Sequence, residues 1–306
     1  MKKDLLSIKD LAAGEIECIL KLSYELKRNK KKFSKALAGK NIALIFQKPS
    51  NRTRVSFEVG MYQLGGNALY LSPNEINIGI REGIKDVAKT ISRYVDGIVL
   101  RTFEHKNCLD MASCATVPII NGLSDFSHPC QVLADLFTIR EKLKQLKGIL
   151  LAYVGDGNNV CNSLLLAAAK TGMYMNVASP QGYAPSQEVI KQAQTFAKET
   201  GSRITVTDDP VSAVKGAHIV YTNVWASMGQ EEEINKRKVI FKDFQINAEL
   251  LAGASPDVLI MHCLPAHRGE EITDEVMDSR NSIVFDQAEN RLHVQKAILI
   301  KLLKGA

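Results

Sequence analysis

Short apolar runs alternate with longer amphipathic segments, and this alternation predicts the architecture of the first half of the chain. The apolar runs, typical of buried β-strands, lie at residues 41–46, 68–72, 97–102 and 117–120. Helical spacing follows, clearest over 52–64 and from about 84 to 95. Parallel strands need a crossover connection, usually a helix, to return to the same edge. The pattern therefore predicts a parallel sheet covered by helices on both faces.

A second series of the same kind opens after the charged segment 141–148. Its apolar runs lie at residues 149–154, 175–178, 204–207, 218–222, 258–261 and 282–286, and an amphipathic helix is expected over 290–304. We therefore predict an α/β protein of two domains, each a parallel-stranded sheet flanked by helices. The first domain comprises 1–147 with a C-terminal helix, 290–306, that returns to it, and the second comprises 148–289.

Composition and charge narrow the class of protein. The 306 residues are 45% hydrophobic and 24% charged, as in ordinary globular proteins, which argues against a disordered, collagen-like or coiled-coil chain. The formal net charge is +6, but the basic segment 27–35 alone supplies six positive charges. A nucleic-acid site would interleave aromatic residues with a basic stripe, and only Phe33 lies in this segment. We expect no nucleic-acid partner.

The cysteines and the apolar runs bear on the compartment. Six cysteines are scattered without a C-x-x-C pair, which is typical of a reduced, intracellular protein rather than a disulfide framework. The basic start of the chain leads into no long apolar stretch, so no signal peptide is expected. No apolar run approaches the length of about 18 residues that suggests a membrane span. These features predict a cytoplasmic protein without a membrane partner.

Ligands of open parallel sheets bind beyond the carboxyl ends of the strands, and segment 46–54 follows the first predicted strand. Ser50 can cap the next helix, whose first turn offers free N–H groups and the positive end of the helix dipole. Arg52 and Arg54 add guanidinium groups. As simple surface charges they would oppose the dipole at a cost, so the pattern favours a phosphate-binding site.

Two more strand ends in the first domain carry polar groups. Arg101 closes the run 97–102, where a charge can face either a ligand or solvent. In segment 125–131, Pro129 is suited to a helix start, which places His128 at its tip and Gln131 one turn later. An imidazole can polarise a carbonyl group and a carboxamide can bind an amide, whereas Cys130 needs no role beyond packing.

In the second domain, segment 155–160 only partly matches a dinucleotide-binding fingerprint. Val160 occupies the position of the third glycine, and no acidic residue ends the next strand, 175–178, so a nicotinamide cofactor is disfavoured. Its adjacent asparagines suit a carboxylate or an amide of a small substrate. Cys263, at another strand end, is by residue type a nucleophile, a hydrogen-bonding group or, most commonly, a small buried side chain. Trp225 is expected to pack in the core.

Five ordered motifs make the chain resemble the aspartate/ornithine carbamoyltransferase superfamily, specifically its ornithine carbamoyltransferases, essentially from end to end. The motifs are SNRTR at 50–54, HPCQ at 128–131, DGNNV at 156–160, SMGQE at 227–231 and HCLP at 262–265. The resemblance implies transfer of the carbamoyl group of carbamoyl phosphate to the side-chain amine of L-ornithine, giving L-citrulline and phosphate. It also implies no metal or organic cofactor and a homotrimer, or a multiple of one, with sites between subunits.

The resemblance also assigns roles to individual residues. For carbamoyl phosphate these are Ser50, Asn51, Arg52, Thr53, Arg54, Asn77, Arg101, His128, Pro129, Cys130, Gln131, Cys263, Leu264 and Arg291. Of these, Arg101, His128 and Cys263 are expected to be catalytic. For ornithine they are Asn159, Asn223, Ser227 and Met228.

Three positions depart from the family pattern. Asn51 stands where threonine is commoner, and Asn77 where a longer glutamine usually reaches a neighbouring site. Asn223 stands where the family usually has an aspartate that pairs with the α-ammonium of ornithine. The last change leaves open another acceptor amine, such as putrescine or a modified ornithine. Aspartate fits less well, because the substrate loop adds no cation. A catalytically silent relative is the alternative from another class.

Overall fold

The computed structural model describes residues 4–76, 78, 81–226 and 231–304. The chain forms two compact units, with the divisions after Phe137 and after Ala288, so that most of the last helix belongs to the first unit. The predicted fold class is confirmed, because each unit contains a parallel sheet flanked by helices. The first division falls inside helix α6 (Pro129–Leu143), earlier than the predicted boundary at 147.

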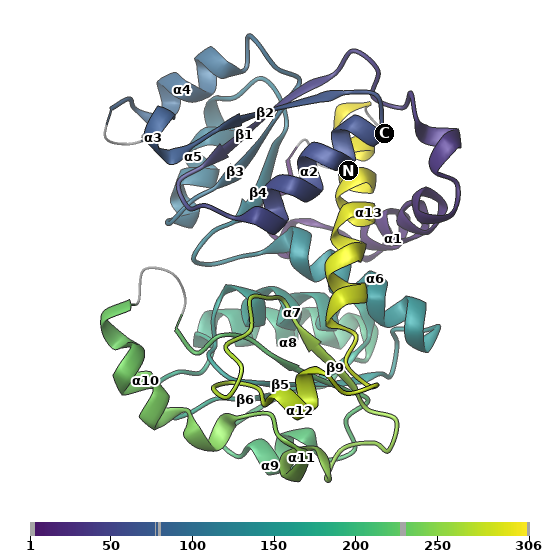
Figure 1. Cartoon of the computed structure of the whole chain (residues 1–306), viewed down its shortest axis with the longest axis vertical. Coiled ribbons are helices and arrows are strands. Elements are labelled where there is room, and N and C mark those ends of the chain that lie inside the picture. Colours follow the sequence, from purple (N-terminus) through teal and green to yellow (C-terminus); the bar gives the residue numbers. More distant parts are fainter. Residues whose placement is uncertain (1–3, 77, 79–80, 227–230, 305–306) are drawn as a thin grey trace. The chain divides into compact units, whose positions relative to one another are not determined.

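In the first unit, four parallel strands lie in the order β2-β1-β3-β4 (Figure 1). The strands are β1 (Asn41–Phe46), β2 (Asn67–Leu71), β3 (Gly97–Arg101) and β4 (Ile119–Leu123). The helices are α1 (Ala13–Arg28), α2 (Asn51–Gln63), α3 (Pro73–Ile76), α4 (Ile84–Ile91), α5 (His105–Cys114), the first part of α6, and α13 (Val284–Leu303) from Glu289 onward. β1 is buried at every residue after the first, as expected for a strand covered on both faces.

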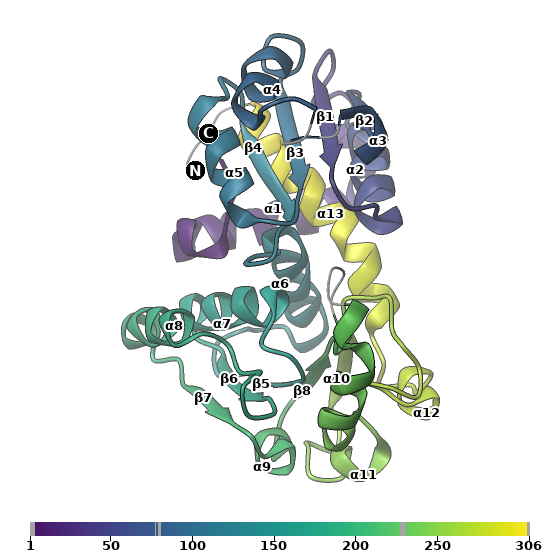
Figure 2. The same ribbon diagram turned by 90° about the vertical axis from the view of Figure 1, so that its left-hand side faces the viewer.

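In the second unit, five parallel strands lie in the order β7-β6-β5-β8-β9. The strands are β5 (Leu150–Val154), β6 (Tyr174–Ala178), β7 (Ile204–Thr207), β8 (Ile219–Thr222) and β9 (Leu259–His262). The helices are α7 (Asn159–Thr171), α8 (Gln187–Thr200), α9 (Pro210–Val214), α10 (Ile234–Ile240), α11 (Ala248–Leu251) and α12 (Asp274–Met277). Helices α7 and α8 cover one face of this sheet, and α9 and α11 lie on the other (Figure 2).

The strand orders create one topological switch point in each sheet. The chain moves outward from β1 to β2 and then returns to form β3 on the other side of β1; in the second sheet, the same reversal separates β5 from β8. Loops on the two sides of a switch point diverge and leave a crevice at the carboxyl ends of the strands, where ligands of such sheets bind.

One predicted strand is wrong. Of residues 282–286, only Ser282 makes a bridge, to Ile260, and helix α13 begins at Val284. The burial fits a helix, because Val284, Gln287 and Arg291 are buried at intervals of three and four residues while Phe285 is 69% exposed. The C-terminal helix therefore starts before residue 290, the predicted position. Strand β4 also begins two residues later than predicted, after Pro118, which has no N–H to donate.

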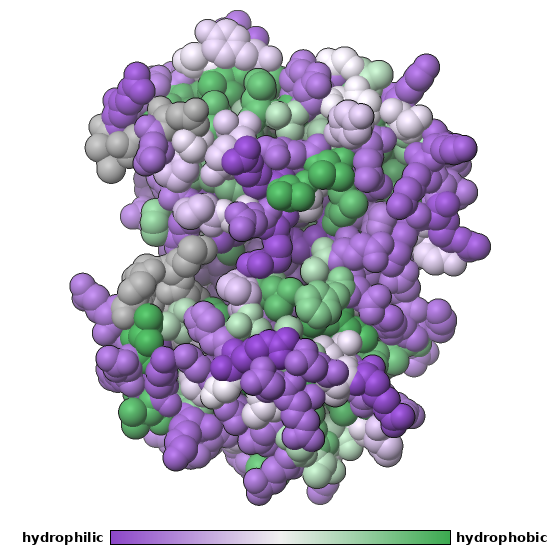
Figure 3. Space-filling model, viewed as in Figure 1, coloured by the Kyte–Doolittle hydropathy of each residue, from purple (hydrophilic) through white to green (hydrophobic). Residues whose placement is uncertain are grey.

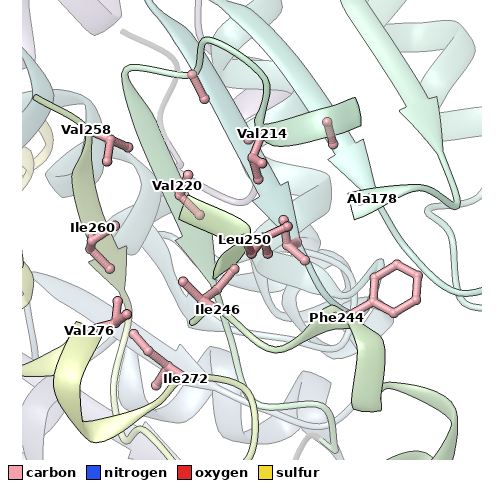
Figure 4. Packing of buried hydrophobic residues seen from close by; sticks show 14 of the residues in the cluster. Ala178, Val214, Val220, Phe244, Ile246, Leu250, Val258, Ile260, Ile272 and Val276 are labelled. Carbon is pink, nitrogen blue, oxygen red and sulfur yellow. The ribbon is translucent and has the colours of Figure 1, made fainter. Parts of the chain in front are cut away.

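The apolar core of the second unit fills the space between its sheet and helices α9 and α11. Figure 4 shows Val214, Val220, Ile246 and Ile260 pointing toward one another from these elements and the adjoining loops. Trp225 belongs to the same cluster, as predicted, and its ring stacks on that of Phe241 with 5.9 Å between the centroids. None of the helices in the described ranges combines the length and apolar character needed to cross a membrane.

A buried guanidinium ties together the loops that follow β5 and β8. Nη1 of Arg237 donates to the carbonyl of Trp225 (2.7 Å) and lies 3.1 Å from Oδ1 of Asp156, and Nε donates to Glu233 (2.8 Å). Its side chain is only 7% exposed. Burial raises the pKa of Asp156 to about 6, although the positive charge of Arg237 opposes this shift.

We expect Arg237→Gln to lower the free energy of unfolding by about 3–5 kcal/mol at pH 8, because an ionised Asp156 would then be buried without its partner. At pH 5, below the pKa of about 6, Asp156 is protonated and the loss should be smaller. Urea unfolding at the two pH values measures the difference. Glu233→Gln, which removes only the exposed partner of Arg237, should change little at either pH. If Arg237→Gln lowers the free energy of unfolding equally at both pH values, the ion pair with Asp156 does not account for the stabilisation.

Candidate active site

The first candidate cluster lies at the switch point between β1 and β3. Ser50 caps α2, with its Oγ accepting the N–H of Thr53 (3.3 Å), so the helix begins beside the end of β1, as predicted. Nη2 of Arg291 donates to Oγ1 of Thr53 (2.8 Å). The returning helix α13 thus places a buried guanidinium, 3% exposed, at the first turn of α2. An anion at this position would meet a helix N-terminus and a cation together.

The two arginines predicted from the SNRTR motif differ in position. Arg52 is partly buried, and its charge lowers the pKa of His128, which places it within electrostatic reach of the imidazole. Arg54 is exposed, pairs with Glu58 (2.9 Å) and stacks over the ring of Tyr70, 3.9 Å from its centroid. Asn51 is also exposed. Arg52 therefore lies near the cluster formed by His128 and the start of α2, whereas Arg54 contacts Glu58 and Tyr70 on the exposed side of α2.

The loops after β1 and β3 are joined through Gln47, which the sequence analysis missed. Its backbone N–H donates to the carbonyl of Arg101 (2.7 Å), and its Oε1 accepts from the hydroxyl of Thr102 and the N–H of Phe103 (3.2 Å). Arg101 is 5% exposed at the end of β3. Lys48, also missed, is 8% exposed, and its Nζ lies over the ring of Phe103, 4.1 Å from the centroid. Both residues lie just before the predicted motif at 50–54. The sequence shows this position, but it does not show that their side chains contact the loop after β3.

His128 ends a tightly bonded loop between β4 and α6. The N–H of Ser124 donates to the carbonyl of Ser127 (3.0 Å), and Nδ2 of Asn121 donates to the same carbonyl (3.3 Å), which fixes the backbone just before His128. Burial, followed by the positive charges of Arg291, Arg101 and Arg52, holds the pKa of His128 well below its usual range. The imidazole is therefore neutral at pH 7, and one ring nitrogen carries a proton that it can donate.

Helix α6 continues from this loop with Pro129, Cys130 and Gln131, all buried. Nε2 of Gln131 donates to Oδ1 of Asp135 (2.9 Å), whereas its Oε1 accepts no hydrogen bond from the described residues. A buried acceptor in this state suits an N–H of a bound ligand. Burial raises the pKa of Cys130 to about 12, and its thiol faces the carbonyl of Asn121 (3.5 Å), which fits the packing role left open above.

In the second unit, the loop after β5 owes its glycines to packing. A Cβ on Gly157 would lie 2.3 Å from the backbone nitrogen of Pro185, and Gly155 has φ of +144°. Asn158 caps α7 by accepting the N–H of Val160 (3.0 Å), and Asn159 is the first residue of that helix. The partial dinucleotide pattern is therefore explained by a tight turn and a helix cap.

The loops after β8 and β9 meet through a side-chain contact. Sγ of Cys263 donates to Oδ1 of Asn223 (3.0 Å), so the structure brings these two predicted residues together. Leu264 follows in the left-handed region, with φ of +58°. Its N–H donates to Nδ1 of His262 (2.8 Å). Nδ1 is therefore an acceptor, and the ring N–H lies on Nε2, which donates to Glu271 (2.9 Å).

The pair formed by His262 and Glu271 is fully buried and was missed by the sequence analysis, since its members lie nine residues apart without a helical or strand spacing. It braces the turn that presents Cys263 and Leu264. The predicted residues Asn77, Ser227 and Met228 lie outside the described residues.

One group of possible metal ligands occurs in the described ranges, namely His267, Glu270 and Glu271, whose ligand atoms lie within 4.8 Å of one another. Glu270 is paired with Lys238 (2.7 Å), and Glu271 accepts from His262 and from the backbone of His267 (2.7 Å). Both hydrogen bonds of Glu271 fall on Oε1, and its buried Oε2 has no hydrogen-bond partner among the described residues. Glu270 is neutralised by Lys238, and we assign no metal to the group.

Comparisons with known proteins match both units. The model of the aspartate/ornithine carbamoyltransferase carbamoyl-P binding domain matches residues 3–141, and that of the Asp/Orn binding domain matches 147–302. An ornithine carbamoyltransferase from Thermococcus kodakarensis is 54% identical, covering 99% of this chain and 97% of its own. One from Anoxybacillus flavithermus is 53% identical, covering 98% of this chain and 96% of its own.

Solved structures agree with the sequence relatives. The ornithine carbamoyltransferase from Pyrococcus furiosus superposes with a TM-score of 0.96 at 53% identity, covering 99% of this chain and 97% of its own. The anabolic enzyme from Campylobacter jejuni gives a TM-score of 0.94 at 38% identity, covering 98% of each chain. The resemblance seen in the five motifs is confirmed, and the chain belongs to the aspartate/ornithine carbamoyltransferase family.

Proposed function

We propose that this chain is an ornithine carbamoyltransferase, which joins carbamoyl phosphate and L-ornithine to give L-citrulline and phosphate. The observation that carries the proposal is a neutral, buried His128 within electrostatic reach of Arg52, Arg101 and Arg291, beside the start of α2. The full-length relatives bearing that name support it. We further propose a cytoplasmic enzyme of arginine biosynthesis, the direction indicated by the name of an anabolic relative from Pyrococcus furiosus that is 54% identical.

The phosphate group of the donor would bind at the first turn of α2. Its oxygens would accept from the N–H groups of Asn51 and Arg52 at the start of the helix, from the hydroxyls of Ser50 and Thr53, and from the guanidiniums of Arg52 and Arg291. These groups carry fixed positive charge in a largely dehydrated place, where charge acts more strongly than in water. They would therefore stabilise the phosphate more as it leaves and gains negative charge.

The carbamoyl group would lie toward Arg101, His128 and Gln131. Arg101 and the ring N–H of His128 would donate to the carbonyl oxygen, and Oε1 of Gln131 would accept from the carbamoyl NH₂. The neutral amine nitrogen attacks the carbonyl carbon, and negative charge develops on the oxygen. The bond from carbon to the phosphate oxygen then breaks, and the leaving phosphate accepts the proton that the amine loses.

The second unit would bind the amine substrate. Asn159 after β5 and Asn223 after β8 flank the switch point of this sheet, and we assign them, with Ser227 and Met228, to ornithine. Cys263 and Leu264, held by the turn after β9, are assigned to the carbamoyl group by the family resemblance. Cys263 meets Asn223 directly within the second unit.

We also propose a homotrimer or a multiple of one. Outward-facing Val55, Val59 and Tyr62 follow one stripe of α2 and are 54%, 37% and 82% exposed. Figure 3 shows hydrophobic atoms gathered over this helix. Such a stripe is what a subunit interface would bury.

Arg101→Met should lower the rate of citrulline formation roughly 100- to 1,000-fold, the usual cost of losing one donor to a developing oxyanion. Arg93→Met, which removes an exposed guanidinium of the same unit, serves as the control. A colorimetric assay of the ureido product measures both. Full activity in Arg101→Met would contradict the role of Arg101, and failure of the unaltered protein to bind carbamoyl phosphate would favour a silent relative.

His128 should remain neutral as the pH falls through 6.5, the region in which an ordinary histidine gains its second proton. Nitrogen-15 NMR of labelled histidine rings reports this directly, and His128→Asn identifies the signal. A protonation step of the His128 signal near pH 6.5 would show that the ring is solvated and that the three guanidiniums do not act on it.

Val59→Lys should weaken self-association, because it places a charge on the stripe of α2. Light scattering of the unaltered protein is expected to give a mass of three chains or a multiple, and that of the variant a smaller one. An unaltered protein that remains a single chain of 33.7 kDa at micromolar concentration would contradict the proposal.

A further inference from the structure

The carboxamide of Asn223 is fixed in one orientation by two donors. Its Oδ1 accepts the backbone N–H of Val224 (2.9 Å) and the thiol of Cys263 (3.0 Å). A backbone N–H can only donate, so the atom that faces it must be the oxygen. Nδ2 therefore occupies the other branch of the side chain, and rotation of the amide by 180° would set two N–H groups against each other.

Nδ2 of Asn223 brings two hydrogen-bond donors to the ligand edge of the sheet. It donates no hydrogen bond to any residue in the described ranges, although Asn223 is only 6% exposed. The residue directly follows β8, the strand beside the switch point, and Cys263 follows β9 next to it. A nearly buried donor in this place requires an acceptor from water or from a ligand.

Among the described residues, the carboxylates of the loops after β5 and β9 each face a partner. Asp156, in the loop after β5, faces the guanidinium of Arg237 at 3.1 Å, and Glu271 accepts from the ring of His262 at 2.9 Å. The thiol of Cys263 donates its hydrogen bond to Oδ1 of Asn223. The group of Asn223 that is left for a ligand is therefore the NH₂ of its carboxamide. This is the positive end of the amide dipole, and it repels an ammonium ion.

From this geometry we propose that Asn223 is a specificity-determining residue that receives the carboxylate of the amine substrate. This inference rests on the proposed transfer to a side-chain amine. It adds that the carboxylate of the amine substrate is the group that lies at the end of β8. A carboxylate oxygen accepts from Nδ2, whereas an α-ammonium would only add a third donor. The α-ammonium of ornithine thus contributes little to binding, and an ω-amino acid without it is also a substrate.

The test compares L-ornithine with 5-aminopentanoate, which has the same chain length, the same reacting amine and the same carboxylate but no α-amino group. With saturating carbamoyl phosphate, kcat/KM of the unaltered protein should differ by less than about tenfold between the two compounds. In Asn223→Asp, an oxygen replaces Nδ2 and accepts an ammonium. Its kcat/KM should rise ten- to thirtyfold for ornithine and fall at least about tenfold for 5-aminopentanoate.

Asn247→Asp is the matched control. Asn247 caps α11 in the same unit by accepting the N–H of Leu250 (2.9 Å), a bond that aspartate can also make, and it adds the same charge away from the strand ends. Asn247→Asp should leave kcat/KM unchanged for both compounds. Asn223→Ala should lower kcat/KM for both compounds by a similar factor, since both would lose the same donor.

The outcomes separate this inference from the proposed function. Efficient use of ornithine with more than 100-fold discrimination against 5-aminopentanoate by the unaltered protein would overturn the inference and leave the function standing. Because that comparison uses the unaltered protein, it holds even if a variant fails to fold, which circular dichroism would show. Carbamoylation of 5-aminopentanoate but not of ornithine would overturn ornithine as the substrate and the expected similarity of the two compounds, while it would support the contact between Asn223 and the carboxylate. An absence of transfer to either compound would overturn both.

Discussion

The hydrogen bond from Arg291 to Thr53 is the contact on which the anion cluster of the first unit depends. It joins the returning helix α13 to the first turn of α2, so a residue near the end of the chain completes a cluster that begins at residue 50. Both partners are buried, and a guanidinium buried beside a helix N-terminus opposes the dipole of that helix. Without an anion the guanidinium and the helix N-terminus repel each other. A bound phosphate would attract both groups and make the arrangement favourable.

The same concentration of positive charge determines the state of His128. Three guanidiniums act on a ring that is already dehydrated, and both effects disfavour a further proton. A protonated ring would add a fourth positive charge and would carry a second N–H donor that needs an acceptor. A neutral ring instead offers one N–H to a carbonyl oxygen and leaves the phosphate to the arginines. The division of roles between imidazole and guanidiniums thus follows from their shared burial.

The parts of this structure that sequence could predict are those in which local pattern and local function coincide. The segment 46–54 combined a strand end, a cap and arginines that oppose a dipole, and each signal lies within nine residues. Gln47 and Lys48 were missed because their role comes from a neighbouring strand, and the buried partners Arg237 and Glu271 because their contacts join distant segments. The run 282–286 was misassigned because four apolar or small residues in a row suit a strand and a buried helix start equally.

The two sheets place their clusters by the same topological rule but with opposite chemistry. In the first unit the switch point carries cations and a neutral imidazole; in the second it carries amides, a thiol and carboxylates that are already paired. On the proposed function, activation of the carbamoyl donor would depend on the first cluster, and the choice of acceptor would depend on the second. A change from a carboxylate to an amide at residue 223 can therefore alter which amine is recognised without disturbing the groups that stabilise the oxyanion or the leaving phosphate. On the proposed function, the motifs of the transfer chemistry can therefore be complete in a chain whose acceptor position departs from the family pattern.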